Sequence, residues 1–238
     1  MQKKEKEMRK AIFWDFDGTL VQSPSLWSNA FLQALKGAWP GCPLSLEDVR
    51  PHLRSGFPWH TPEKDFTGLT GERWWEHMVC HFEKAGLALG ATQEIASKAA
   101  RAVREIIVSP ENYALYEDTL QVLDRLKALG FSQYIVSNNY PELFRIAAAL
   151  GLAPYFSGMV VSGEIGYDKP RPEIFEAALE LAGHPGCCFF IGDNPVADGQ
   201  GAADAGIPVL LVHIRENPRG FTAFETLTQV LHCVEGKI

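Results

Sequence analysis

Two aspartates, Asp15 and Asp17, stand two residues apart after the short apolar run Ala11 to Trp14, and Gly18 follows them. Carboxylates this close repel each other, so a cation facing both would offset the repulsion. Their oxygens suit Mg²⁺, which takes few protein ligands and keeps several waters, and Gly18 permits a sharp turn. The alternative is an exposed acidic turn, because Asp-Gly pairs are common in turns. This cluster alone leaves both interpretations open.

Three further polar clusters follow later in the chain. Ser137, Asn138 and Asn139 offer a hydroxyl and backbone N–H groups at an expected helix start, which suits an anion; plain helix capping is the alternative. Lys169 precedes two prolines and can direct its ammonium at one point, although most lysines are solvated. Asp193 and Asp198 add two carboxylates, for which the alternatives are a turn residue and a charge on a helix face.

The elements that must position these residues alternate between strands and helices after residue 115. Strands are expected at 133–137, 158–162, 188–191 and 209–212, with helices between them. This alternation predicts an α/β fold: a doubly wound, Rossmann-like parallel sheet with helices on both faces. Ligands of such sheets bind outside the carboxyl ends of the strands. The first, second and fourth clusters follow expected strands, so we expect them to meet there.

The stretch between the first strand and the alternating part has a helical texture. Trp74, Trp75, Met78 and Phe82 recur at helical spacing, and Thr92 is a plausible N-cap for a second helix. We therefore expect an inserted helical cap domain at residues 23–111 and an α/β core formed by residues 1–22 and 112–238.

The overall composition argues against a nucleic-acid or membrane partner. Of the 238 residues, 22 are Lys or Arg and 29 are Asp or Glu, a net charge of −7, which disfavours a nucleic-acid partner. No apolar run approaches the ~20 residues that a membrane span needs, and the charged amino terminus does not resemble a signal peptide. The five cysteines lack zinc-site spacing. We expect a cytoplasmic protein without a nucleic-acid or membrane partner; the oligomeric state stays unknown.

Taken together, the four clusters resemble the motifs of the haloacid dehalogenase-like hydrolase superfamily. The first motif is Asp15-Phe16-Asp17-Gly18-Thr19, and the second is Ser137-Asn138. The third is Lys169 in a Lys-Pro context, and the fourth is Gly192-Asp193 with Asp198. Their order and context are far more specific than any one of them.

The resemblance implies a role for each acidic residue. Asp15 would be the nucleophile that becomes an aspartyl phosphate, and Asp17 the general acid that later acts as a base. Mg²⁺ would be held by Asp15, by the backbone carbonyl of Asp17 and by Asp193, with Asp198 supporting from nearby. These roles suit phosphoryl transfer, which depends on positioning and on neutralising spread negative charge.

The resemblance also implies that Ser137, Asn138 and Lys169 bind the phosphoryl group. A dehalogenase of this superfamily lacks the acid–base aspartate because it protonates no alkoxide, so Asp17 favours phosphoryl transfer. We expect a Mg²⁺-dependent phosphomonoesterase acting on a small phosphorylated metabolite. The alternatives are a phosphomutase acting on a sugar phosphate and a non-catalytic phosphate-sensing or partner-binding member of the fold.

The segment 54–63 of the expected cap is rich in Pro and Gly yet carries aromatic residues. One interpretation is a specificity loop in which Arg54, Trp59 and His60 face the leaving group of the substrate. The other is a packed connector whose aromatic side chains bury against cap helices. The sequence leaves both open.

Overall fold

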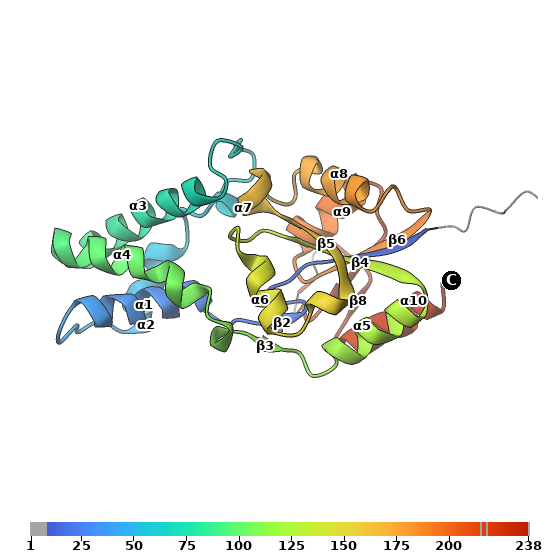
Figure 1. Ribbon diagram of the computed structural model, residues 1–238, viewed down its shortest axis with the longest axis horizontal. Coiled ribbons are helices and arrows are strands. Elements are labelled where there is room, and N and C mark those ends of the chain that lie inside the picture. The colour runs from blue at the N-terminus through green and yellow to red at the C-terminus, as the bar shows by residue number, and fades with distance from the viewer. Residues whose placement is uncertain (1–8, 215, 218, 238) are drawn as a thin grey trace, which may run out of the picture.

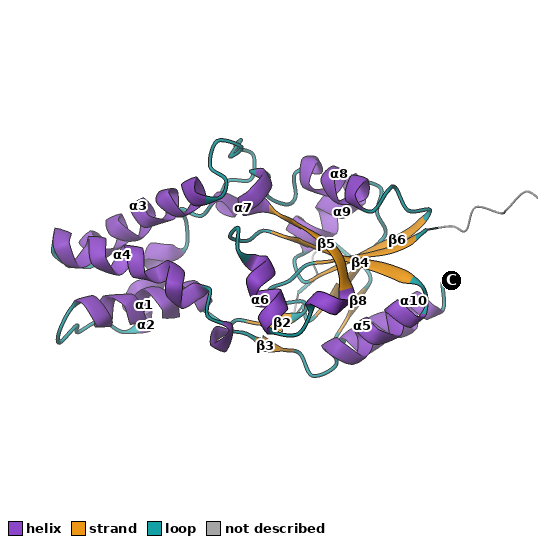
Figure 2. Cartoon of the chain, in the orientation of Figure 1, coloured by secondary structure: helices purple, strands orange, loops and turns teal. Residues whose placement is uncertain are grey.

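The computed structural model describes residues 9–214, 216–217 and 219–237 and contains a sheet region and a helical region (Figures 1 and 2). Six parallel strands form the sheet in the order β5-β4-β1-β6-β7-β8. They are β1 (Lys10–Trp14), β4 (Phe131–Ser137), β5 (Phe156–Val161), β6 (Cys187–Gly192), β7 (Val209–Val212) and β8 (Ala223–Phe224). This order confirms the predicted α/β fold.

Strand β1 lies in the middle of the sheet because both of its faces are apolar. Ile12 and Trp14 pack into one hydrophobic cluster, while Ala11 and Phe13 pack into the other. Side chains alternate between the two faces of a strand, so an all-apolar run needs helices on both sides. The first face is covered by α5 (Thr119–Ala128), α6 (Leu143–Ala149) and α10 (Leu227–Glu235), and the second by α8 (Pro172–Leu181) and α9 (Gly201–Asp204).

A helical region interrupts the chain between two short strands, β2 (Val21–Gln22) and β3 (Ala114–Leu115), which pair antiparallel. We call residues 23–113 the helical insert. Its α-helices are α1 (Leu26–Ala38), α2 (Leu46–Val49), α3 (Glu72–Ala88) and α4 (Gln93–Ile107). Thr92 caps α4, since its Oγ1 accepts a hydrogen bond of 3.3 Å from the N–H of Ile95.

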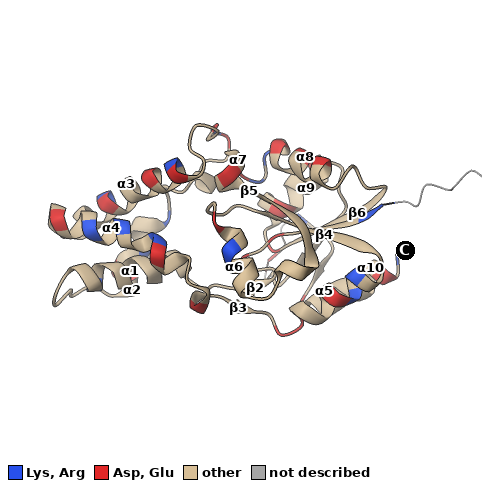
Figure 3. Ribbon diagram, viewed as in Figure 1, with Lys and Arg blue, Asp and Glu red and all other residues tan. Residues whose placement is uncertain are grey.

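The helices carry polar outer faces and apolar inner faces. Both basic and acidic residues lie along α3, α4 and α5 (Figure 3), while Trp74, Met78 and Phe82 of α3 and Val103 of α4 are buried. The helical spacing of the apolar residues thus correctly identified the inner faces. In the described part of the chain, no helix combines the length and apolarity required to cross a bilayer.

Several hydrogen bonds join the helical insert to the sheet region. The backbone N–H groups of Phe66 and Gly71 donate hydrogen bonds of 3.2 and 3.0 Å to the carbonyls of Gly166 and Gly163, in and after the short helix α7 (Ser162–Ile165). Elsewhere, Trp75 Nε1 donates a hydrogen bond of 2.7 Å to the buried Glu142. These contacts hold the insert beside the carboxyl edge of the sheet.

Some elements were not predicted. Strands β2, β3 and β8 have two residues each, and α10 follows the last predicted strand. The segment after Asn194 begins with π-helical turns over Pro195–Gln200 before α9. Four short 3-10 helices complete the structure, at Arg50–Leu53, Pro58–His60, Pro110–Asn112 and Ala153–Tyr155.

Candidate active site

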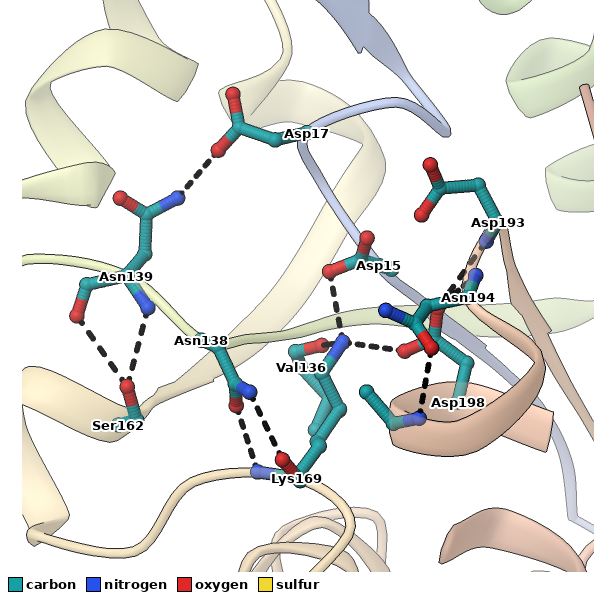
Figure 4. Close-up of polar contacts among 11 residues, drawn as sticks. Asp15, Asp17, Val136, Asn138, Asn139, Ser162, Lys169, Asp193, Asn194 and Asp198 are labelled. Carbon is teal, nitrogen blue, oxygen red and sulfur yellow. Dashed lines mark hydrogen bonds and ion pairs between the residues drawn. The ribbon is translucent and has the colours of Figure 1, made fainter. Parts of the chain in front are cut away.

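Three of the four polar clusters meet at the carboxyl edge because their strands are neighbours. In the parallel register, Trp14 of β1 lies opposite Ile135 of β4 and Ile191 of β6. Asp15 therefore comes directly after β1 beside the ends of β4 and β6, and its N–H continues the ladder with a hydrogen bond of 2.9 Å to the carbonyl of Ile191. Asp193 follows β6 at the same level, and Figure 4 shows its carboxylate pointing toward Asp15.

Lys169 reaches this edge from the loop before α8. Its buried Nζ donates hydrogen bonds of 2.7 Å to Asp15 Oδ1, 2.6 Å to Asp198 Oδ1 and 2.9 Å to the Val136 carbonyl (Figure 4). Burial by itself disfavours the charged ammonium, but the two carboxylates outweigh it and raise the pKa of Lys169 above its usual value. The group is therefore a fixed positive charge beside Asp15.

Asn138 holds the backbone of Lys169 in place. The Lys169 N–H donates to Asn138 Oδ1 at 2.6 Å, and Asn138 Nδ2 donates to the Lys169 carbonyl at 3.0 Å. Both ends of the amide are engaged in this pair of hydrogen bonds. In this structure Asn138 fixes the position of the lysine loop at the edge of the site.

Asp198 and Asp193 differ in their hydrogen bonds. Asp198 is buried; its Oδ2 accepts from the N–H groups of Asp193 at 3.1 Å and Asn194 at 2.9 Å, while its Oδ1 pairs with Lys169. The Asp193 carboxylate accepts no hydrogen bond from any described residue. Burial and the repulsion of Asp15 and Asp198 raise the pKa of Asp193 to about 8. The single positive charge of Lys169 cannot neutralise the three carboxylates of Asp15, Asp193 and Asp198 at this edge.

The arrangement of the carboxylates fits a divalent cation. Asp15, Asp193 and Asp198 can each bring one carboxylate oxygen within 4.8 Å of those of the other two. Both oxygens of Asp198 already accept hydrogen bonds. Asp15 and Asp193 therefore have the carboxylate oxygens that remain available to a cation. Gly18 makes room for Asp193, since a Cβ at Gly18 would lie 2.2 Å from Asp193 Oδ2. Hard oxygen donors of this kind suit Mg²⁺.

Asp17 lies on the other side of Asp15 and is held by two side chains. Ser23 Oγ donates to its Oδ1 at 2.5 Å, and Asn139 Nδ2 donates to its Oδ2 at 2.6 Å. Burial raises the pKa of Asp17 to about 6, with a further contribution from Asp15, although both hydrogen bonds oppose the shift. The sequence placed Asn139 in the second polar cluster but did not predict its contact with Asp17, and it assigned no role to Ser23.

A cavity of about 300 Å³ opens over these groups. Its lining comprises Asp15, Asp17, Trp59, Pro62, Asn138, Lys169, Pro170, Asp193, Asn194, Val196, Ala197 and Asp198. Trp59 and Pro62 come from the helical insert, so both regions form the cavity. A larger cavity of about 560 Å³ lies near the amino ends of β1 and β4 and contains no carboxylate in its lining.

The remaining predicted residues are not among those that line the cavity. Ser137 is buried as the last residue of β4. Arg54 and His60 are exposed, and His60 Nδ1 accepts a hydrogen bond of 3.4 Å from the N–H of Phe57. Of the three predicted specificity residues, the structure therefore places only Trp59 at the cavity.

A known protein family matches most of this chain. The family model described as "haloacid dehalogenase-like hydrolase" matches residues 9–206, which include all four polar clusters. The chain belongs to this family. The hydrolase has the parallel sheet that the strand–helix alternation predicted.

The individual relatives share at most about a third of their residues with this chain over the aligned regions. The hydrolase is 31% identical over 147 residues to the mouse haloacid dehalogenase-like hydrolase domain-containing protein 3, covering 61% of this chain and 57% of the mouse protein's length. It is 26% identical over 244 residues to glyceraldehyde 3-phosphate phosphatase from Methanothermobacter thermautotrophicus, covering 94% of this chain and 98% of that protein. The structure of the putative HAD-hydrolase YfnB from Bacillus subtilis superposes with a TM-score of 0.72 at 19% identity, covering 97% and 100% of the two chains. This structural likeness supports the fold.

Proposed function

We propose that this hydrolase is a Mg²⁺-dependent phosphomonoesterase that cleaves a small phosphorylated metabolite through an aspartyl phosphate on Asp15. The observation that carries the proposal is the placement of one permanently charged lysine, Lys169, against Asp15 beside the unpaired carboxylate of Asp193. The phosphatase name of the archaeal relative, which matches over nearly its whole length, supports the same reaction.

Asp15 and Asp17 divide the chemistry between them. A carboxylate oxygen of Asp15 forms a bond to phosphorus as the bond between phosphorus and the leaving oxygen breaks. Asp17 gives its proton to that leaving oxygen and later accepts a proton from the water that hydrolyses the aspartyl phosphate. The pKa of Asp17 near 6 suits a group that must both donate and accept a proton near neutral pH.

Lys169 stabilises the negative charge of the transferring phosphoryl oxygens, and Asn138 keeps its loop in place. Asp15, Asp193 and the backbone carbonyl of Asp17 would hold Mg²⁺, with Asp198 positioning both Lys169 and the Asp193 loop. When bound, the ion would supply further charge neutralisation at the phosphoryl group. Ser137 and Asn138 remain proposed phosphoryl ligands.

The helical insert serves as the cap in this proposal, and the α/β region as the catalytic core. Trp59 is the specificity residue with structural support, because it lines the cavity; the same role for Arg54 and His60 stays a prediction. The cytoplasmic location and the lack of a nucleic-acid or membrane partner also stay predictions.

Release of inorganic phosphate from a panel of phosphomonoesters, with and without Mg²⁺, tests the proposal. We expect release that requires the ion and that disappears in Asp15→Asn. Isomerisation of a sugar phosphate without phosphate release would instead indicate a phosphomutase. Partner binding that survives Asp15→Asn, with no turnover of any ester, would indicate a non-catalytic member of the fold.

A further inference from the structure

The cavity has a polar side and an apolar side. The carboxylates and Lys169 form the polar side, where the phosphoryl group would sit. The rest of the wall consists mainly of Trp59, Pro62, Pro170, Val196 and Ala197. Val196 is 45% exposed, although it is a large apolar residue. A leaving group seated in the cavity would cover this side chain.

Trp59 forms part of the cavity wall, and neighbouring aromatic rings hold it in place. Its ring stacks on Phe57 with centroids 4.7 Å apart and planes 19° apart, and a second stacked contact joins it to Trp74 at 6.2 Å. Phe57 and Trp74 are themselves buried, so they fix the position of Trp59. Aromatic rings pair favourably with such a surface in offset or edge-to-face geometry.

The charge of the cavity excludes a second anionic group. Lys169 is the only cationic side chain in the lining, all of which lies within the described residues. Its ammonium lies against Asp15 and Asp198, on the side of the cavity where the phosphoryl group would sit. A carboxylate or second phosphate on the leaving group would lie at the apolar side of the cavity, where the lining offers no cationic side chain to pair with it.

We propose that the substrate is a phosphate monoester whose leaving group is uncharged and carries a planar apolar ring seated against Trp59 and Val196. This inference rests on the proposed function and specifies the substrate class of the same site. The cavity volume of about 300 Å³ accommodates a phosphoryl group and a leaving group of roughly one ring system.

Four synthetic esters separate charge from shape: benzyl phosphate, 4-carboxybenzyl phosphate, cyclohexylmethyl phosphate and ethyl phosphate. We expect kcat/KM for benzyl phosphate to exceed that for the 4-carboxy analogue at least about tenfold, because the carboxylate would lose water at an apolar wall that offers it no cation. It should exceed that for the saturated ring about 2- to 10-fold. Equal or faster cleavage of 4-carboxybenzyl phosphate would overturn the inference.

Substitutions of Trp59 and Val196 test whether these two residues determine the preference for an uncharged ring. Trp59→Ala should lower the benzyl-to-ethyl ratio of kcat/KM about 2- to 10-fold, whereas Trp39→Ala, at a half-buried tryptophan outside the lining, should leave the ratio unchanged. Val196→Lys should raise kcat/KM for the 4-carboxy ester relative to benzyl phosphate about 2- to 5-fold. The inference fails if Trp59→Ala and Trp39→Ala give the same ratio, or if Val196→Lys does not favour the carboxylate.

The same assays separate this inference from the proposed function. Absence of phosphate release from these four esters and from the whole panel of phosphomonoesters, or release that persists in Asp15→Asn, overturns the proposed function and this inference with it. Release from other esters of the panel but from none of these four overturns this inference alone. Release that depends on Asp15 but is fastest for the charged ester overturns this inference alone.

Discussion

Replacement of Lys169 by methionine tests whether one buried cation balances the strand-end carboxylates. The variant keeps most of the side-chain volume but leaves Asp15 and Asp198 without the ammonium that lies 2.7 and 2.6 Å from their oxygens. Removing one partner from a buried ion pair destabilises a protein by about 3–5 kcal/mol. We expect a loss of this size in the free energy of unfolding at neutral pH without Mg²⁺, and a loss of catalysis.

The loss should shrink as the pH falls. Burial already raises the pKa of Asp198 to about 6 with Lys169 present, and removing the cation should raise it further. A carboxyl group whose pKa is higher in the folded state than in the unfolded state stabilises the fold when protonated, and that contribution is lost as the pH rises. The variant should therefore recover stability relative to wild type between pH 7.5 and pH 5.

Urea denaturation in EDTA at these two pH values measures the effect. Lys98→Met is the matched control, because Lys98 is exposed on α4 and such changes usually stay within about 0.5 kcal/mol. A destabilisation of Lys169→Met below about 1 kcal/mol, or one that is equal at both pH values, would refute the electrostatic reasoning.

Three further predictions concern other parts of the site. Asp193→Asn should raise the Tm of the metal-free protein, because burial and the neighbouring Asp15 and Asp198 carboxylates disfavour the ionised form of Asp193 that the unfolded chain adopts at neutral pH. The variant should also lose the Tm increase produced by Mg²⁺; a Mg²⁺ shift equal to that of wild type would contradict this. Asp17→Asn should lower kcat for alkyl phosphates by about 10²- to 10⁴-fold but less for 4-nitrophenyl phosphate, whose leaving group needs less protonation; equal losses in steady-state assays would oppose a proton-donor role. Glu142→Ala should destabilise the protein by about 1.5–3 kcal/mol in urea denaturation, because Trp75 and Arg104 lose a buried acceptor; an unchanged midpoint would show that this contact contributes little.

The sequence predicted the features that depend on local pattern. The apolar run Ala11 to Trp14 and the later strand–helix alternation predicted the parallel sheet, and Thr92 predicted the start of α4. Parallel neighbours bring strand ends to one edge, so Asp15 and Asp193 could be placed together before any coordinates were known.

Features that depend on how separate regions meet could not be predicted. Ser23 holds Asp17 from the first residue of the helical insert, and its sequence context is an ordinary Ser-Pro. Trp59 lines the cavity while Arg54 and His60 do not, because backbone contacts to Gly163 and Gly166 fix the orientation of the insert. Strand β8 has only two residues, too few for a recognisable alternation.

The central claim is that these groups converge on one phosphorus atom, which Asp15 attacks. Mass spectrometry of peptides from the enzyme, acid-quenched during turnover of benzyl phosphate with Mg²⁺, tests this most directly. We predict one phosphoryl group on the peptide that contains Asp15, localised to that residue, and none in Asp15→Asn. Steady turnover with the phosphoryl group on another residue, or with no phosphorylated peptide under conditions that stabilise acyl phosphates, would contradict it.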